Sequence, residues 1–145
     1  MTELSAGLTY SLTIKVTDDL TVPSVSPVYT GFADMPPVFA TAYMVGFVEW
    51  TCIEALRPYL EPDQGTVGTH IDISHVGASP VGSKVTAEIE LLAINKRKLR
   101  FKVTCRDEAG LIGEGFHERA IIKSDTFMAG VLKRRDQADS NRRTA

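Results

Sequence analysis

One unusually apolar stretch stands out in the pattern of hydrophobic and polar positions, and it lies between Pro36 and Leu60. Between Met35 and Ile53 its one charged residue is Glu49. The stretch has no strong two-residue alternation and is longer than most strands, so its length and its Ala, Met, Leu and Glu content predict a helix. Because apolar residues lie all round this helix, we expect it to be buried on most sides.

Prolines mark both predicted ends of this helix. Pro36 and Pro37 fit a first helical turn, where backbone N–H groups lack partners in any case, and Asp34 can cap that turn. Pro58 and Pro62 follow the apolar stretch and are expected to end the helix.

Segments with two-residue alternation precede and follow the helix. The first covers residues 8–17, and a loop over residues 18–34 then leads to the helix, either as a lid or as a packed surface loop. Further strands are expected over residues 65–78, 84–93, 99–106 and 111–124. The positions predicted to face the helix are Leu8, Tyr10, Leu12, Ile14, Val16, Val67, Thr69, Ile71, Ile73, His75, Val85, Ala87, Ile89, Leu91, Ala93, Leu99, Phe101, Val103 and Cys105.

This order of elements predicts an α+β protein in which a curved, mostly antiparallel sheet wraps around one long central helix, the hot-dog fold. A single sheet would leave part of the helix uncovered, so a homodimer is expected. We predict one domain over residues 1–127 and a polar C-terminal tail over residues 128–145. A short helix is expected from Asp125, and residues 133–145 are expected to be disordered.

Composition narrows the possible functions. The 145 residues are enough for one domain with a real core, and the net charge of −2 gives no general attraction to nucleic acid. Cys52 and Cys105 are expected to be reduced core residues. The N-terminus does not resemble a signal peptide and the helix is too interrupted to span a membrane, so we expect a cytoplasmic protein. No metal-ligand spacing and no phosphate-binding loop appear, so neither a metal nor a cofactor is predicted.

Residues of the helix and of the strand after it are candidates for a site. Glu49 lies where an unpaired buried charge would cost several kcal/mol, so it belongs either to a structural ion pair or to a functional site. Thr41 precedes it by eight residues, which places the two side chains about 80° apart around the helix, so they can border one pocket. Gly46 suggests close approach by a strand or a ligand. His75, at the end of an apolar strand face, is either a satisfied core histidine or part of the same site.

A cluster of basic residues surrounds the predicted turn between two of the later strands. It either binds phosphates or forms a solvated hairpin tip, and its members are Lys96, Arg97, Lys98, Arg100 and Lys102.

Three separated motifs carry a resemblance to a known family. VFATAYMVGFVEWTCIEALRPYLEP, GTVGTHIDISHVGASPVG and GEGFHERAII, in this order, resemble hot-dog thioesterases of the fluoroacetyl-CoA thioesterase type. The resemblance covers most of the chain, from about Phe32 to Ile122. It implies the hot-dog fold, a dimer and hydrolysis of acyl-CoA, with CoA as part of the substrate.

The resemblance also implies roles for particular residues. It implies a catalytic set of Thr41, Glu49 and His75 and a substrate-binding role for Gly68 and Arg119. Two further substrate contacts are expected on the loop before the helix, at Phe32 and Met35, and the family's fluoroacetyl enzyme has a second phenylalanine at the latter position. We therefore expect a thioesterase for small or short acyl groups. The alternatives are a module that binds acyl-CoA without hydrolysis and, less favoured because its motifs are missing, a dehydratase.

Overall fold

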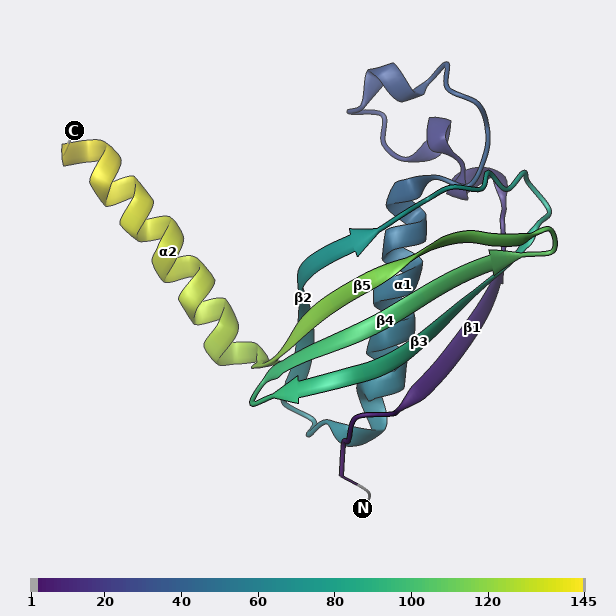
Figure 1. The fold of residues 1–145 in the computed structure, drawn as a ribbon. Helices are drawn as coiled ribbons and strands as arrows, with labels where there is room; N and C mark the ends of the chain where they lie inside the picture. The colour runs from purple at the N-terminus through teal and green to yellow at the C-terminus, as the bar shows by residue number, and fades with distance from the viewer. Residues whose placement is uncertain (1–2, 145) are drawn as a thin grey trace.

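The alternating segments form one five-stranded sheet in the computed structural model, which describes residues 3–144. Its strands are β1 (Thr9–Lys15), β2 (Gln64–Ile73), β3 (Lys84–Asn95), β4 (Lys98–Asp107) and β5 (Gly110–Lys123). They lie in the order β1-β3-β4-β5-β2, and every neighbouring pair is antiparallel. Strands β1 and β2 are therefore the two edges of the sheet (Figure 1).

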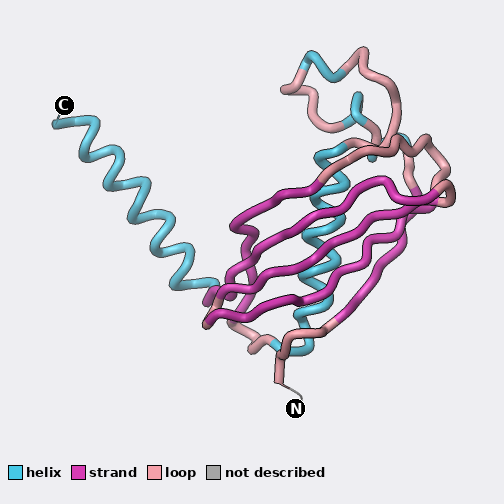
Figure 2. The backbone as a smooth tube through the Cα atoms, in the orientation of Figure 1, coloured by secondary structure: helices cyan, strands magenta, loops and turns pink. Residues whose placement is uncertain are grey.

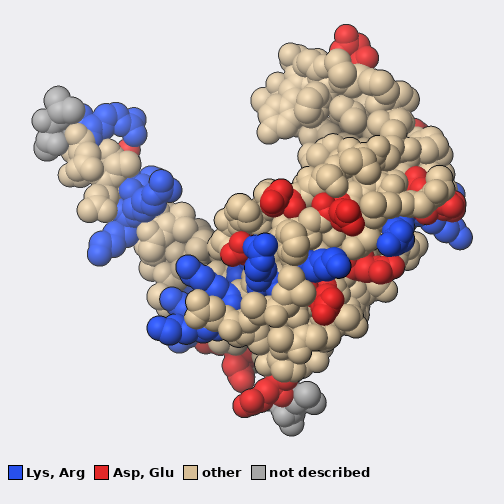
Figure 3. All heavy atoms as spheres, in the orientation of Figure 1, with Lys and Arg blue, Asp and Glu red and all other residues tan. Residues whose placement is uncertain are grey.

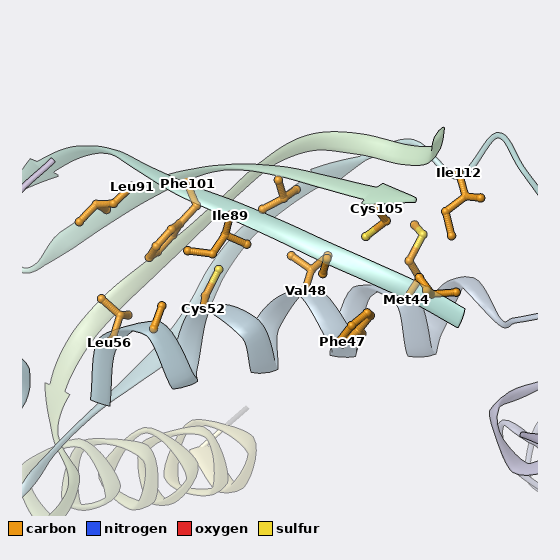
Figure 4. Packing of buried hydrophobic residues seen from close by; sticks show 14 of the residues in the cluster. Met44, Phe47, Val48, Cys52, Leu56, Ile89, Leu91, Phe101, Cys105 and Ile112 are labelled. Atoms are coloured by element: carbon orange, nitrogen blue, oxygen red, sulfur yellow. The ribbon is translucent and has the colours of Figure 1, made fainter. Parts of the chain in front are cut away.

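Helix α1 (Thr41–Leu56) runs along the concave face of this sheet (Figures 1 and 2). Its inward side chains pack on the apolar residues of the middle strands (Figure 4), and each large side chain buried in this way contributes about 1.5–3 kcal/mol. The hot-dog fold expected from the sequence is thus confirmed. The fully buried core includes Met44, Val48, Cys52, Leu56, Val85, Ala87, Leu91, Leu99, Phe101 and Val103.

The helix begins later than its prolines suggested. It starts at Thr41, its N-cap is Ala40, and no side chain caps it, so the predicted cap by Asp34 is wrong. Proline disfavours helical geometry in the residue before it, so Pro37 keeps Pro36 out of the helix. The next residues pair with the loops instead: the Phe39 N–H donates to the Ser79 carbonyl at 2.8 Å and the Ala40 N–H to the Leu20 carbonyl at 3.0 Å.

The C-terminal end of α1 lies close to the end that the sequence predicted. The helix ends at Leu56 and passes into the 3-10 turn η4 (Arg57–Tyr59), which contains Pro58. A proline there cannot supply the N–H that a further helical turn needs.

A β-bulge in β2 changes which residues face the helix. The register of β2 against β5 shifts between Gly68 and His70. Because a bulge inserts one residue, the inward face consists of even-numbered positions such as Thr66 before it and of odd-numbered positions after it. The expectation that Val67 faces the helix is therefore wrong, and Thr69 is the extra residue of the bulge.

A second bulge has the same effect at the far end of β3. The β3–β4 register shifts between Leu91 and Ala93. Leu91 stays buried and opposite Phe101, whereas Ala93 pairs with Arg100 on the outer face. The predicted inward position of Ala93 is thus also wrong, for the same physical reason.

One side of α1 stays uncovered by the sheet. Trp50 is 45% exposed and Gly46 is also exposed, with no atom within 4 Å of where its Cβ would lie among the described residues. The helix is therefore buried on one broad face rather than on most sides. The close approach expected at Gly46 is not made within one chain.

The loop before α1 stands above the N-terminal end of the helix (Figure 2). It folds into short 3-10 turns, η1 (Asp18–Leu20), η2 (Val22–Ser24) and η3 (Thr30–Phe32). Its tip is exposed.

The C-terminal helix begins near Asp125 as expected, but it continues through the residues that were expected to be disordered. Helix α2 (Ser124–Thr144) leaves the body beside the end of β5 and extends away from it (Figure 1). Its many Lys, Arg, Gln and Ala residues have high helix propensity, and Arg142 bonds to Asp139 one turn earlier at 3.0 Å. Within residues 3–144, no helix is both long enough and apolar enough to cross a membrane.

Basic side chains gather where α2 leaves the body and along α2 itself (Figure 3). Part of this charge is balanced within the sheet, because Arg100 pairs with Glu118 at 2.8 Å and stacks over the Phe116 ring at 4.5 Å. These contacts favour the solvated hairpin tip over a phosphate site for Arg100.

Candidate active site

Thr41 and His75 form a hydrogen-bonded pair at the N-terminal end of α1. Thr41 is the first residue of the helix, and its Oγ1 lies 2.7 Å from His75 Nδ1. His75 follows the end of β2, where the Val76 N–H donates to the Ile112 carbonyl at 2.7 Å and so fixes the segment. The sequence prediction that these two residues share a site is consistent with this geometry.

The surroundings of His75 favour a neutral imidazole. Burial lowers the pKa of His75, and a backbone hydrogen bond at Gly77 opposes this shift only in part. Its Nε2 is buried and, among the described residues, has no hydrogen-bond partner. A neutral imidazole next to a hydroxyl is arranged to take a proton from it.

Glu49 belongs to a second polar cluster further along α1. Its Oε1 lies 3.1 Å from Arg119 Nη1, and the Arg119 side chain is almost completely buried. The guanidinium has further partners, since Nε donates to Thr66 Oγ1 and Nη2 to the Thr66 carbonyl, both at 2.9 Å. Arg119 Nη1 also lies 3.1 Å from His117 Nε2. The ion pair, one of the two alternatives for Glu49, is thus present.

The carboxylate of Glu49 nevertheless remains accessible. Its side chain is 39% exposed, on the side of α1 that the sheet leaves open. One face of the carboxylate is therefore fixed by a buried cation while the other is free to meet a ligand.

Gly68 makes room for this ion pair. A Cβ at Gly68 would lie 2.5 Å from Glu49 Oε1, 3.3 Å from His117 Cε1 and 3.4 Å from Arg119 Nη1. Glycine is therefore required at this position for close approach of the carboxylate to the strand.

A single chain keeps the two clusters apart. Thr41 and Glu49 are separated by about 12 Å along the helix axis. Among residues 3–144, no hydrogen bond connects Glu49 with Thr41 or His75. One chain alone thus presents two halves of the predicted catalytic set rather than one assembled group.

The two predicted substrate contacts on the loop lie near its exposed tip. Phe32 is 36% exposed and Met35 is 44% exposed. The Phe32 ring meets the Tyr29 ring edge to face at 5.7 Å between centroids. The Tyr43 hydroxyl connects this loop to α1, at 3.4 Å from the Val25 carbonyl. The roles of Phe32 and Met35 remain predictions.

Sequence reasoning missed two members of the Glu49 cluster, His117 and Thr66. His117 precedes Arg119 by two residues on one strand, so strand alternation alone could have placed both side chains on the inner face. Thr66 could not have been found in this way, because the bulge in β2 reverses the face on which it lies.

The cysteines take no part in this arrangement. Cys52 and Cys105 are free and buried, as predicted, and burial raises their pKa values to about 12 and about 11. Such thiols are not reactive nucleophiles at neutral pH. In the described part of the chain, no group of three or more His, Cys, Asp or Glu side chains is placed to hold a metal ion.

The antiparallel sheet wrapped around one helix defines the class of hot-dog-fold proteins. A Thermus thermophilus hypothetical protein of the thioesterase superfamily has the same fold, with a TM-score of 0.82 at 21% identity over 97% of this chain and 99% of its own. A solved structure of the fluoroacetyl-CoA thioesterase FlK matches with a TM-score of 0.88 at 39% identity, over 91% of this chain and 98% of that one.

Sequence comparison is more specific. The fluoroacetyl-CoA thioesterase of Streptantibioticus cattleyicolor is 43% identical over 114 residues, which cover 79% of this chain and 82% of the relative. The model of the fluoroacetyl-CoA-specific thioesterase family matches residues 16–125. The chain belongs to this family.

The space at Gly68 generates a direct prediction. In Gly68→Ala the new methyl group collides with Glu49 Oε1, the end of a flexible side chain on an open face, so the carboxylate moves and the fold persists. We expect thioester hydrolysis to fall by about tenfold or more, with a melting temperature within about 5 °C of wild type. Kinetics with an acyl-CoA substrate and a thermal melt measure both.

Gly65→Ala is the matched control on the same strand, because among residues 3–144 no atom beyond its two chain neighbours lies within 4 Å of its new Cβ. Wild-type turnover in Gly68→Ala would show that the position of the Glu49 carboxylate is not critical.

Proposed function

We propose that the protein is a thioesterase that hydrolyses small acyl-CoA thioesters to the free acid and CoA, with Thr41, Glu49 and His75 as its catalytic residues. The observation that carries this proposal is the 2.7 Å contact between the Thr41 hydroxyl and the partly buried imidazole of His75. Membership of the thioesterase family supports it. A module that only binds acyl-CoA has no need of a base next to a hydroxyl.

The reaction needs an oxygen nucleophile, a proton donor for the leaving thiolate and hydrogen-bond donors for the oxyanion. His75 takes the proton of the attacking oxygen, which belongs to Thr41 or to a water that Thr41 holds, and returns it to the sulfur of CoA. Glu49, fixed by Arg119, has one of two roles. It takes the proton of the attacking oxygen in place of His75, or it attacks the carbonyl carbon itself, so that CoA leaves as the thiolate and water then hydrolyses the resulting anhydride. Backbone amides near Gly68 stabilise the oxyanion, because the missing side chain permits close approach.

The acyl group is small in this proposal. The loop that carries Phe32 and Met35 would close over it from the N-terminal end of α1. Methionine is unbranched and adapts to different shapes, so it sets a less rigid limit than a second aromatic ring would. We therefore propose a range of short acyl-CoAs broader than fluoroacetyl-CoA.

A symmetric dimer completes the site in this proposal. Strand β2 is an edge of the sheet, and its Ile71 is 42% exposed. On the open side of α1, Trp50 is 45% exposed and Gly46 is open. Exposed apolar side chains beside an unpaired strand edge are typical of a surface that a partner covers. Pairing β2 with its symmetry copy runs the two α1 helices antiparallel, which directs Thr41 and His75 of one subunit toward the partner's Glu49.

The open side of α1 agrees with a dimer. The free cysteines agree with a protein that acts in the reducing cytoplasm.

The function is tested by assaying a panel of acyl-CoAs with a thiol-trapping reagent. We expect release of CoA from acetyl-, propionyl- and fluoroacetyl-CoA at comparable rates, and much slower release from long-chain substrates. No thiol release from any substrate, together with measurable binding, would favour the non-catalytic module. A large preference for fluoroacetyl-CoA over acetyl-CoA would refute the role given to Met35, and Met35→Phe is the matched variant for that comparison.

The shared site is tested by mixing two inactive variants, Glu49→Gln and His75→Ala. If each site combines Glu49 of one subunit with His75 of the other, a mixed dimer keeps one intact site of two. Random pairing then restores about a quarter of wild-type turnover. Coexpression with two affinity tags allows the mixed dimer to be isolated. Activity no higher than the sum of the parent variants would show that each site lies within one subunit, and a monomer in solution would refute the dimer itself.

A further inference from the structure

His117 lies behind the predicted catalytic set without belonging to it. It is only 2% exposed, on the inner face of β5, opposite Phe101 of β4 and Ile71 of β2. A buried imidazole at this depth needs partners for both ring nitrogens. The structure supplies both.

Its two partners fix the protonation state of the ring. His117 Nδ1 lies 2.7 Å from the His70 carbonyl, and a carbonyl can only accept a hydrogen bond. His117 Nε2 lies 3.1 Å from Arg119 Nη1, and a guanidinium can only donate. The ring is therefore neutral, with its proton on Nδ1 and a bare Nε2 that accepts from Arg119.

The bulge in β2 places the first of these partners. The register against β5 shifts between Gly68 and His70, so the His70 carbonyl lies at an irregular point of the β2–β5 ladder. That carbonyl receives the imidazole N–H. Bulges re-aim backbone and side-chain groups in this way next to functional sites.

The second partner connects the ring to the site. The same Arg119 Nη1 that donates to His117 also donates to Glu49 Oε1 at 3.1 Å. His117 Nε2 and Glu49 Oε1 lie 4.0 Å apart, too far for a hydrogen bond, so the imidazole acts on the carboxylate through the Arg119 guanidinium. Arg119 is thereby held from one side by β2 through Thr66 and from the other by His117.

We propose that His117 is a positioning residue: as a neutral Nδ1–H imidazole held by the His70 carbonyl, it orients Arg119 and, through Arg119, the Glu49 carboxylate. The expected effect of His117 on turnover rests on the proposed function. The protonation state of the His117 ring does not depend on that function.

The charges around His117 agree with a neutral ring. Burial lowers the pKa of His117 most strongly, and the adjacent Arg119 charge lowers it further. The His70 carbonyl, Glu49 on α1 and Glu118 on the same strand oppose this shift. Protonation would place an imidazolium against a buried guanidinium and remove the acceptor that holds it, so the arrangement weakens as the pH falls.

Two substitutions separate positioning from packing. His117→Leu fills the space but removes the acceptor, so we expect kcat to fall by about 10- to 100-fold with little change in KM. His117→Gln keeps an acceptor for Arg119 but cannot be protonated, and it should retain most of the wild-type kcat. Phe101→Leu, directly opposite on β4, is the matched control: it removes core packing without a polar group and should lower the melting temperature but leave kcat unchanged.

Wild-type kcat in His117→Leu, or an equal loss in the Leu and Gln variants, would overturn the proposal. The ring itself is tested without any substrate, by ¹H–¹⁵N NMR spectra that distinguish a protonated from a bare ring nitrogen. We expect a proton on Nδ1 only at neutral pH, and a proton on Nε2 would overturn the proposal. If the wild-type protein hydrolyses no acyl-CoA, the proposed function fails while this NMR result still decides the state of His117.

Discussion

The ion pair between Glu49 and the buried Arg119 is the interaction on which the site depends. A guanidinium removed from water costs several kcal/mol unless its charge is balanced and its N–H groups are bonded. Here the balance comes from the one charged residue in the apolar part of α1, and the bonding from Thr66 and His117. Other features follow from this requirement, since Gly68 gives the carboxylate room and the β2 bulge places the His70 carbonyl behind His117.

The fold explains why the Glu49–Arg119 ion pair lies where a ligand can reach the carboxylate. The sheet covers one broad face of α1 and supplies Arg119 from β5, while the opposite side of the helix stays open. Glu49 stands at this boundary, with a buried cation on one side and an exposed surface on the other. A second subunit that covers the open side would exclude water from the carboxylate and strengthen each electrostatic contact there.

Much of this arrangement could be predicted from the sequence, because alternation and apolar content are local signals. They identified the strands, the core positions of β4 and the central helix. The bulges could not be foreseen, since one inserted residue near Thr69 or Leu92 shifts a whole face without altering composition. The start of α1 was misjudged because backbone pairing of Phe39 and Ala40 with distant loops decides it.

The candidate site was predictable to a similar degree. Thr41 and His75 do come together, and Glu49 does carry an ion pair, as single residues in unusual surroundings suggested. The separation of the two clusters was not foreseen, because a helical wheel gives the angle between Thr41 and Glu49 but neglects their distance along the axis. The start of the C-terminal helix near Asp125 was predicted, but its length was not, since a polar segment without an apolar stripe resembles a disordered tail.

The central claim is that Arg119 serves the reaction by holding Glu49, and a double-mutant cycle tests it most directly. Turnover of an acyl-CoA is measured for Glu49→Gln, Arg119→Met and the double variant, with circular dichroism to confirm folding. If Arg119 acts through Glu49, the first variant loses about a hundredfold, the second about tenfold, and the double variant no more than the first. Losses that multiply to about a thousandfold would mean that the two residues act independently, which would contradict this account.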